Sequence, residues 1–144
     1  MHDTPTLYVT QGSGNSIKPV LVASQLGIRC QLRYLNVLAG ESQQDDFLAI
    51  NPQGAVPYMT LPDGTGLGES NAIAWYLAEG SALMPDSALT RAQAIRWMNF
   101  EQTALEAHIS PVRFVTFIAP DLAKEHREMI PGWRQRGNAA LAVL

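Results

Sequence analysis

Short strand-like runs and helical patterns alternate over the first 80 residues of this chain, whereas only helical spacing remains after about residue 87. Residues 6–10 have the composition of a buried strand, and residues 12–15 supply turn and helix-cap side chains for a helix that follows. Residues 29–35 form a second strand by β-propensity. A strand, a helix and a strand in this order predict a parallel pair joined by a right-handed crossover.

The crossover helix is expected to bury one apolar stripe. The members of this stripe are Ile17, Val20 and Leu21. Ala23 and Ser24 are small enough for close packing, and Gly27 stands where a left-handed residue ends a helix. Cys30 falls in the second strand, and a buried small hydrophobic residue is its simplest interpretation.

The rest of the first unit predicts a short helix, a hairpin and a longer helix. Residues 42–50 form the short helix, and residues 57–61 and 65–67 pair across the turn at 62–64. Ser70 is expected to be the N-cap of the last helix. The side chains that this helix is expected to bury are Ile73, Tyr76 and Leu77.

The change of pattern divides the chain into a first domain at residues 1–80, a linker at 81–86 and a helical domain at 87–144. Helical spacing runs from residue 89 to about 118, and Pro111 is expected to kink this helix. A further helical segment is expected up to Met129, with an interruption at Pro131-Gly132.

Charge and composition exclude several classes of function. The formal net charge is −3 and the sequence has no run of Lys or Arg, so we expect no nucleic-acid partner. No apolar stretch approaches the length of a membrane span, and residues 1–4 lack the features of a signal peptide. One cysteine excludes an internal disulfide framework and fits a reducing compartment. We therefore expect a cytoplasmic protein without a membrane partner.

Several linked motifs carry a resemblance to a known family. The order βαβ-α-ββα, with Val56-Pro57 before the third strand, is the thioredoxin-like pattern, and residues 51–57 (NPQGAVP) together with 68–79 (GESNAIAWYLAE) resemble the signature of cytosolic glutathione S-transferases. Residues 13–18 and 47–50 are similar to the bacterial theta-like and beta-like branches of that family. The resemblance covers residues 5–118. Several linked motifs in the family's order are more specific than any one of them alone.

This resemblance implies a thioredoxin-like domain that binds glutathione as co-substrate, followed by an all-α domain. Family members continue for several more helices, so we expect the all-α domain to be incomplete in this sequence. The implied activity is the conjugation of glutathione to an electrophilic small molecule, a detoxification reaction, by a homodimer. A glutathione-dependent disulfide or peroxide reductase, or a non-catalytic binding or scaffold protein, are the alternatives, since fold alone does not determine function.

The resemblance also assigns the binding residues. The peptide bond from Val56 to Pro57 is expected to be cis, and the Val56 main chain would pair with the cysteinyl part of glutathione. The plainer interpretation is that these two residues start an edge strand. Ser70 and the free N–H groups of its helix would hold the γ-glutamyl carboxylate, and Glu69 would face the ammonium group. Gln53 is a candidate donor to the ligand backbone.

The reaction centre is expected at the start of the first helix. Thioredoxin-like oxidoreductases carry two cysteines there, three positions apart, but this chain has Ser13 and Ser16, so the sulfur must arrive with the ligand. By resemblance to serine-type family members, Ser13 would donate a hydrogen bond to the glutathione thiolate. Asn15 and Ser16 are alternatives, and Ser13 and Asn15 also suit a role as simple helix caps. Candidates for the electrophile pocket are His108, Arg113 and Phe114.

Overall fold

The computed structural model describes residues 4–144, so the expectation about a signal peptide falls mainly on residues outside the described part. The chain divides into two compact units, Met1–Met84 and Pro85–Leu144. This division falls inside the segment 81–86 that was expected to be a linker.

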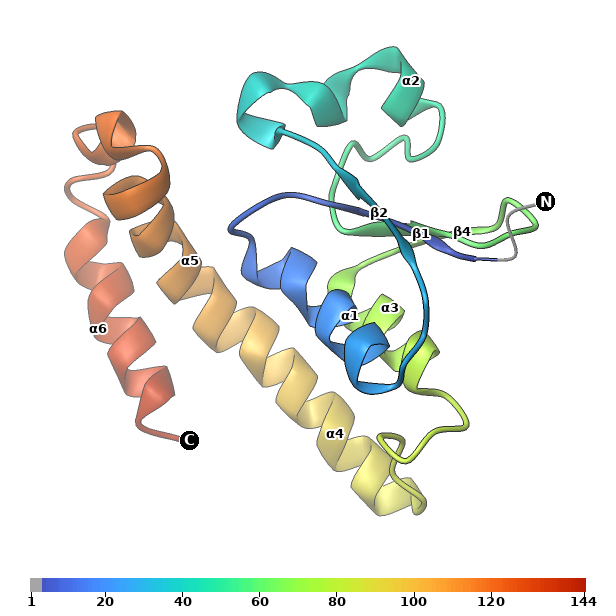
Figure 1. Ribbon diagram of the computed structural model, residues 1–144. Helices are drawn as coiled ribbons and strands as arrows, with labels where there is room; N and C mark the ends of the chain where they lie inside the picture. The colour runs from blue at the N-terminus through green and yellow to red at the C-terminus, as the bar shows by residue number, and fades with distance from the viewer. Residues whose placement is uncertain (1–3) are drawn as a thin grey trace. The chain divides into compact units, whose positions relative to one another are not determined.

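The first unit is built on a four-stranded mixed sheet with the strand order β2-β1-β3-β4 (Figure 1). The strands are β1 Thr6–Val9, β2 Gln31–Tyr34, β3 Tyr58–Thr60 and β4 Gly66–Gly68. β1 pairs parallel with β2 and antiparallel with β3, and β3 pairs antiparallel with β4. The predicted parallel pair and hairpin are therefore confirmed.

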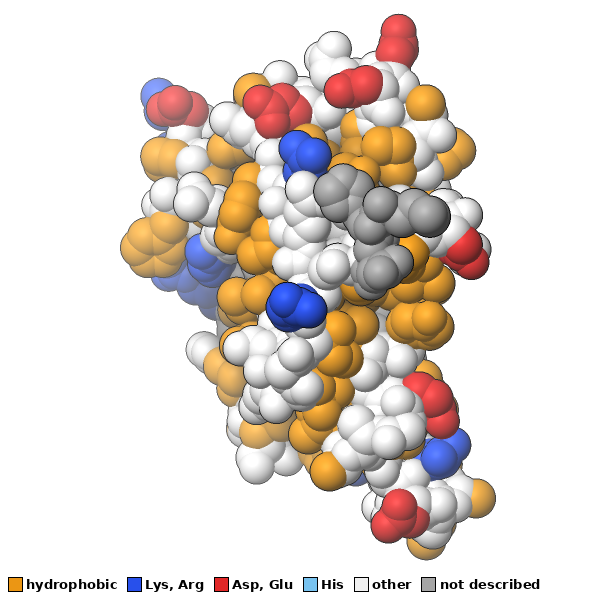
Figure 2. Space-filling view, turned by 45° about the vertical axis from the view of Figure 1, so that its right-hand side comes forward, with side chains coloured by type: hydrophobic (Ala, Val, Ile, Leu, Met, Phe, Trp, Pro, Cys, Tyr) orange, Lys and Arg blue, Asp and Glu red, His pale blue; other side chains and the backbone are white. Residues whose placement is uncertain are grey.

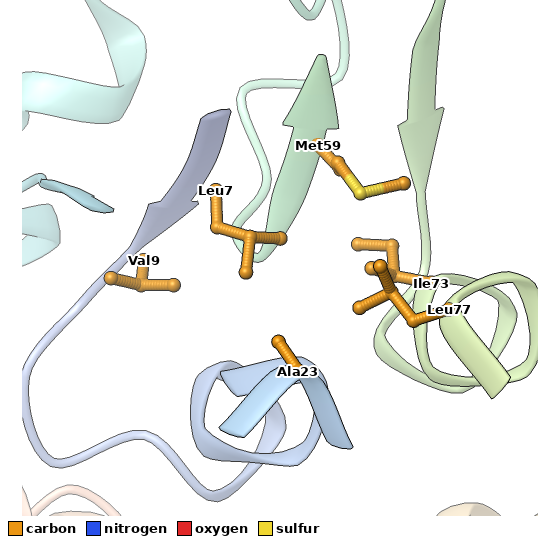
Figure 3. Close-up of a cluster of buried hydrophobic side chains, with 6 residues drawn as sticks. All are labelled: Leu7, Val9, Ala23, Met59, Ile73 and Leu77. Atoms are coloured by element: carbon orange, nitrogen blue, oxygen red, sulfur yellow. The ribbon is translucent and has the colours of Figure 1, made fainter. Parts of the chain in front are cut away.

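Helices α1 and α3 pack together against one face of this sheet (Figure 3). α1 spans Gly14–Gln25 between β1 and β2, and α3 spans Ser70–Ala78 after β4. Between β2 and β3, the helix predicted over residues 42–50 is only partly confirmed, because the extended backbone of Gln44 (φ −79°, ψ 150°) interrupts it. The chain forms three short pieces there: η1 Val37–Ala39, η2 Glu41–Gln43 and α2 Asp45–Leu48. Gly40, with φ 78°, separates the first two pieces because its left-handed backbone cannot continue a helix.

Alternating strand residues and two helix faces make the core of this unit (Figure 3). Its buried side chains are Leu7, Val9, Ala23, Met59, Ile73 and Leu77. The inward positions of Ile73 and Leu77 are confirmed, but Tyr76 is 49% exposed, so its predicted burial is wrong.

The predicted apolar stripe of α1 is confirmed only at Val20, which packs against the core. Of the two small residues expected to pack closely, Ala23 is buried and Ser24 is exposed. Ile17 and Leu21 are 49% and 53% exposed, and the buried positions of α1 are Ser16, Pro19 and Ala23. Small side chains let a helix backbone lie close to its neighbours, and these positions are spaced by three and four residues on one face. Close packing, rather than maximal hydrophobicity, therefore determines which face of α1 is buried.

The second unit is helical. Its elements are α4 Ala88–Phe100, the π-helical η3 Glu101–Glu106, α5 Ala107–Arg113, the π-helical η4 Phe114–Ile118, η5 Pro120–Ala123 and α6 Ile130–Leu141. Ser87 caps α4 through a capping box with Thr90. The predicted interruption at Pro131-Gly132 is wrong, because Pro131 lies in the first turn of α6, where the missing N–H has no intrahelical partner to lose.

On the face drawn in Figure 2, acidic and basic side chains are scattered among polar and hydrophobic ones and do not form one continuous basic surface. Within residues 4–144, no helix combines the length and the apolar character that crossing a bilayer requires.

Candidate active site

Three segments that are distant in the sequence leave the sheet of the first unit at one edge. Tyr58 at the start of β3 pairs with Tyr8 near the end of β1, and also with Gly68 at the end of β4. The turn into α1, the loop before β3 and the junction into α3 therefore begin at neighbouring positions. Every binding or catalytic residue predicted for the first unit lies in one of these segments.

Ser13 is the N-cap of α1. Its Oγ accepts the backbone N–H of Ser16 over 3.2 Å, and Ser16 Oγ in turn accepts the backbone N–H of Thr10 over 3.1 Å. Ser16 is buried, which gives it a structural role in holding the turn. A hydroxyl that accepts one hydrogen bond still has its own hydrogen to donate. Residues 4–144 contain no acceptor for the Ser13 hydrogen, so it is free for a ligand.

The junction into α3 has a strained backbone. Glu69 has φ 66° and ψ 116°, which is unfavourable for a residue with a Cβ and costs about 1–3 kcal/mol. Glu69, and not Ser70 as predicted, is the N-cap, and its side chain makes no capping hydrogen bond. The exposed Glu69 side chain therefore lies beside the N-terminus of α3. The helix N-terminus attracts an anion, and the Glu69 carboxylate attracts a cation such as an ammonium group.

Ser70 is the first residue of α3 and is 5% exposed. Its Oγ donates to Asn15 Oδ1 over 3.2 Å, so the structure brings the predicted residues Asn15 and Ser70 into direct contact. The hydroxyl hydrogen of Ser70 is used in this bond. An anion at this point would therefore interact mainly with the partial positive charge at the N-terminus of α3.

The loop before β3 contains the predicted cis peptide bond between Val56 and Pro57. Val56 is half-buried, and its backbone N–H and carbonyl have no hydrogen-bond partner among the described residues. Gln53 is exposed, and its side chain lies beside Gly68, where an added Cβ would be 3.9 Å from Gln53 Oε1. The loop thus presents the N–H and carbonyl groups of Val56, and the side-chain amide of Gln53 lies in the same loop.

Sequence reasoning missed two residues that hold this loop, Gln43 and Asn51. Gln43 Nε2 donates to the carbonyl of Gly54 over 3.1 Å, and Asn51 Nδ2 donates to the carbonyl of Ala55 over 2.8 Å. The signal for Asn51 was present, since asparagine before proline commonly organises a turn through its side chain. Gln43 gives no such signal, because its contact is eleven residues away.

The remaining candidates belong to other elements. Cys30 is half-buried against the core of the first unit, and burial raises the pKa of its thiol, so it stays protonated and unreactive at neutral pH. His108 lies in α5, where its Nδ1 is 2.8 Å from the carbonyl of Ala104. Arg113 ends α5 and Phe114 begins η4. Their place in an electrophile pocket stays a prediction. Residues 4–144 contain no group of metal-ligating side chains.

Comparison with known proteins identifies the family. Residues 12–79 match the family model described as Glutathione S-transferase, N-terminal domain, and this segment contains every residue predicted to bind or activate the ligand. The crystal structure of a possible glutathione S-transferase from Rhodopseudomonas palustris is 42% identical, with a TM-score of 0.93 over 96% of this chain and 68% of that chain. This chain belongs to the glutathione S-transferase family. The thioredoxin-like fold class with a helical second part is confirmed by the same match.

Curated members of the glutathione S-transferase family and relatives with other names also match. Glutathione S-transferase GstA of Escherichia coli O157:H7 is 34% identical over 90 residues, which are 60% of this chain and 42% of the relative. Elongation factor 1-gamma 3 of Oryza sativa subsp. japonica is 30% identical over 106 residues, which are 72% of this chain and 25% of the relative. The chain thus spans less than half the length of these curated relatives.

Proposed function

We propose that this chain binds glutathione on its first unit, stabilises the thiolate and transfers the sulfur to an electrophilic carbon. The observation that carries the proposal is the hydroxyl of Ser13, which is oriented by the Ser16 N–H and keeps its own hydrogen for a ligand. A hydrogen bond to a charged acceptor contributes about 1.5–3 kcal/mol. This is enough to lower a thiol pKa by about one unit or more.

The other predicted residues complete the binding of a glutathione zwitterion. The unpaired main chain of Val56 would accept and donate one hydrogen bond each to the cysteinyl residue, as in strand addition. The N–H groups that open α3 at Ser70 would hold the γ-glutamyl carboxylate, and Glu69 would face its ammonium group. Gln53 would donate its amide to the ligand backbone. Asn15 would hold the Ser70 side chain in place by accepting its hydrogen bond.

The reaction then follows from the activated sulfur. The thiol proton leaves to solvent, the thiolate of glutathione attacks the electrophilic carbon, and the leaving group departs with its electron pair. The chain's part is to favour the thiolate at neutral pH, with no covalent intermediate on the protein. A homodimer in the cytoplasm, with a small electrophile as second substrate and neither nucleic acid nor membrane as partner, completes the proposal.

Calorimetry with glutathione, followed by turnover with an activated aryl halide, tests this function. Binding together with conjugation supports it. Binding with turnover of a mixed disulfide or hydroperoxide, but not of the aryl halide, would replace it by the reductase alternative.

A second candidate is a non-catalytic binding protein, which the similarity to elongation factor 1-gamma favours. Under this alternative the fold persists while the site does no chemistry. It predicts a folded protein that shows neither glutathione binding nor conjugation. The same calorimetric titration therefore separates the two candidates before any turnover assay.

A further inference from the structure

Asn51 closes the loop that leads to Val56. Its Nδ2 donates to the carbonyl of Ala55 over 2.8 Å, and its Oδ1 accepts the backbone N–H of Gln53 over 3.2 Å. Asn51 is 3% exposed, so both bonds are shielded from water. Shielded bonds of this kind hold a loop in one conformation, because breaking them leaves buried polar groups without partners.

Gln43 holds the same loop from the η2 side. Its Nε2 donates to the carbonyl of Gly54 over 3.1 Å. Gly54 has φ 60°, and a Cβ added there would lie 2.4 Å from Gln43 Nε2 and 2.9 Å from the Ser42 carbonyl oxygen. Glycine is therefore required for this approach, both by its backbone conformation and by the space that the amide occupies.

The side-chain amides of Gln43 and Asn51 donate to the carbonyls of two successive residues, Gly54 and Ala55. The residue that follows is Val56, whose main chain has no hydrogen-bond partner within residues 4–144. We propose that Asn51 and Gln43 are positioning residues that hold the Val56 main chain ready to pair with the peptide backbone of glutathione. This inference rests on the proposed function. Because the loop is already ordered in the folded protein, glutathione binding does not lose the conformational entropy of ordering it.

The test measures the affinity for S-methylglutathione, a thioether whose binding does not involve thiolate stabilisation. The variants are Asn51→Asp, which keeps the shape but removes the Nδ2 donor, and Gln43→Ala. Gln44→Ala is the matched control, because this exposed neighbour reaches only the Gly40 carbonyl over 3.5 Å. We expect about tenfold weaker binding in both variants, the loss of roughly one well-aligned hydrogen bond, and no change in the control.

A second readout separates positioning from a general loss of structure. With glutathione and an aryl halide, KM for glutathione should rise about tenfold in Asn51→Asp and Gln43→Ala, while kcat and the pKa of the bound thiol stay at the wild-type values. Should Asn51→Asp fail to fold, Gln43→Ala decides, since that side chain is exposed. Wild-type affinity in the folded variants would overturn this inference alone. Absence of binding by the wild-type protein would overturn the proposed function, and this inference with it.

Discussion

Ser70 Oγ donates a hydrogen bond to Asn15 Oδ1 over 3.2 Å and so joins the first turns of two helices across 55 positions of sequence. Both helix N-termini carry a partial positive charge. The bond holds the start of α1, where the thiol is expected, at a set distance from the start of α3, where the γ-glutamyl end is expected. A single ligand that spans both ends would benefit from this fixed spacing.

Ser70→Ala removes this bond from a site that is 5% exposed. We expect a loss of about 1 kcal/mol in the free energy of unfolding, the usual net contribution of one such hydrogen bond, measured by urea denaturation. Ser70→Thr keeps the hydroxyl and is the control. If both variants lose equal stability, the hydroxyl is not the cause.

Replacing Glu69 is expected to change stability and glutathione affinity in opposite directions. Glu69→Gly should raise the free energy of unfolding by about 1 kcal/mol, because glycine adopts φ 66° without strain. The same variant should bind glutathione about fivefold more weakly, since an exposed charge pair contributes up to about 1 kcal/mol. Glu69→Gln keeps the strained backbone and removes the charge, so it should lose affinity without gaining stability. A stability gain in Glu69→Gln would contradict this account.

Two glycines of α6 should respond to alanine with opposite signs. Gly132 has only the end of the Arg136 side chain near an added Cβ, at 3.4 Å, so Gly132→Ala should stabilise by about 0.5–1 kcal/mol through helix propensity. At Gly137 an added Cβ would lie 3.1 Å from Ile109 Cγ1 in α5, so Gly137→Ala should destabilise by about 1–3 kcal/mol. Thermal unfolding of both variants tests the packing of α5 on α6, and equal shifts would refute it.

The buried thiol of Cys30 is expected to make the free energy of unfolding depend on pH. Burial raises the pKa of its thiol in the folded protein, so the native state keeps a proton that the unfolded state releases. Its contribution to stability is therefore full below the unfolded pKa and is lost as pH rises through the folded pKa. The free energy of unfolding should fall more steeply above pH 9 in the wild type than in Cys30→Ala. Parallel curves would show that the thiol does not contribute.

Much of the fold was predictable because local signals agree with it. Gly27, with φ 66°, ends the first helix as expected, and the hairpin forms around the predicted turn. The burial of α1 was not predictable from hydrophobicity, since Ser16 and Pro19 are buried while Leu21 is exposed. That face is selected by the space available between packed elements, which no single segment encodes.

The candidate site was predictable at the level of segments and less so at the level of atoms. Ser13, Val56 and Ser70 could be proposed as site residues because turns, helix starts and an X-Pro bond have recognisable local sequence patterns. The bond between Ser70 and Asn15 and the approach of Gln43 to Gly54 are contacts between distant segments, and they appear only once the chain has folded. These long-range contacts decide which hydroxyl hydrogen is free for a ligand.

The pKa of the thiol of bound glutathione tests the central claim most directly. It is measured from the ultraviolet absorbance of the thiolate across pH, in the wild-type protein and in Ser13→Ala, with Ser24→Ala on the exposed side of α1 as control. We predict that Ser13→Ala raises this pKa by about one unit or more, with the affinity for glutathione retained, while the control matches the wild type. An unchanged pKa in Ser13→Ala would contradict the account.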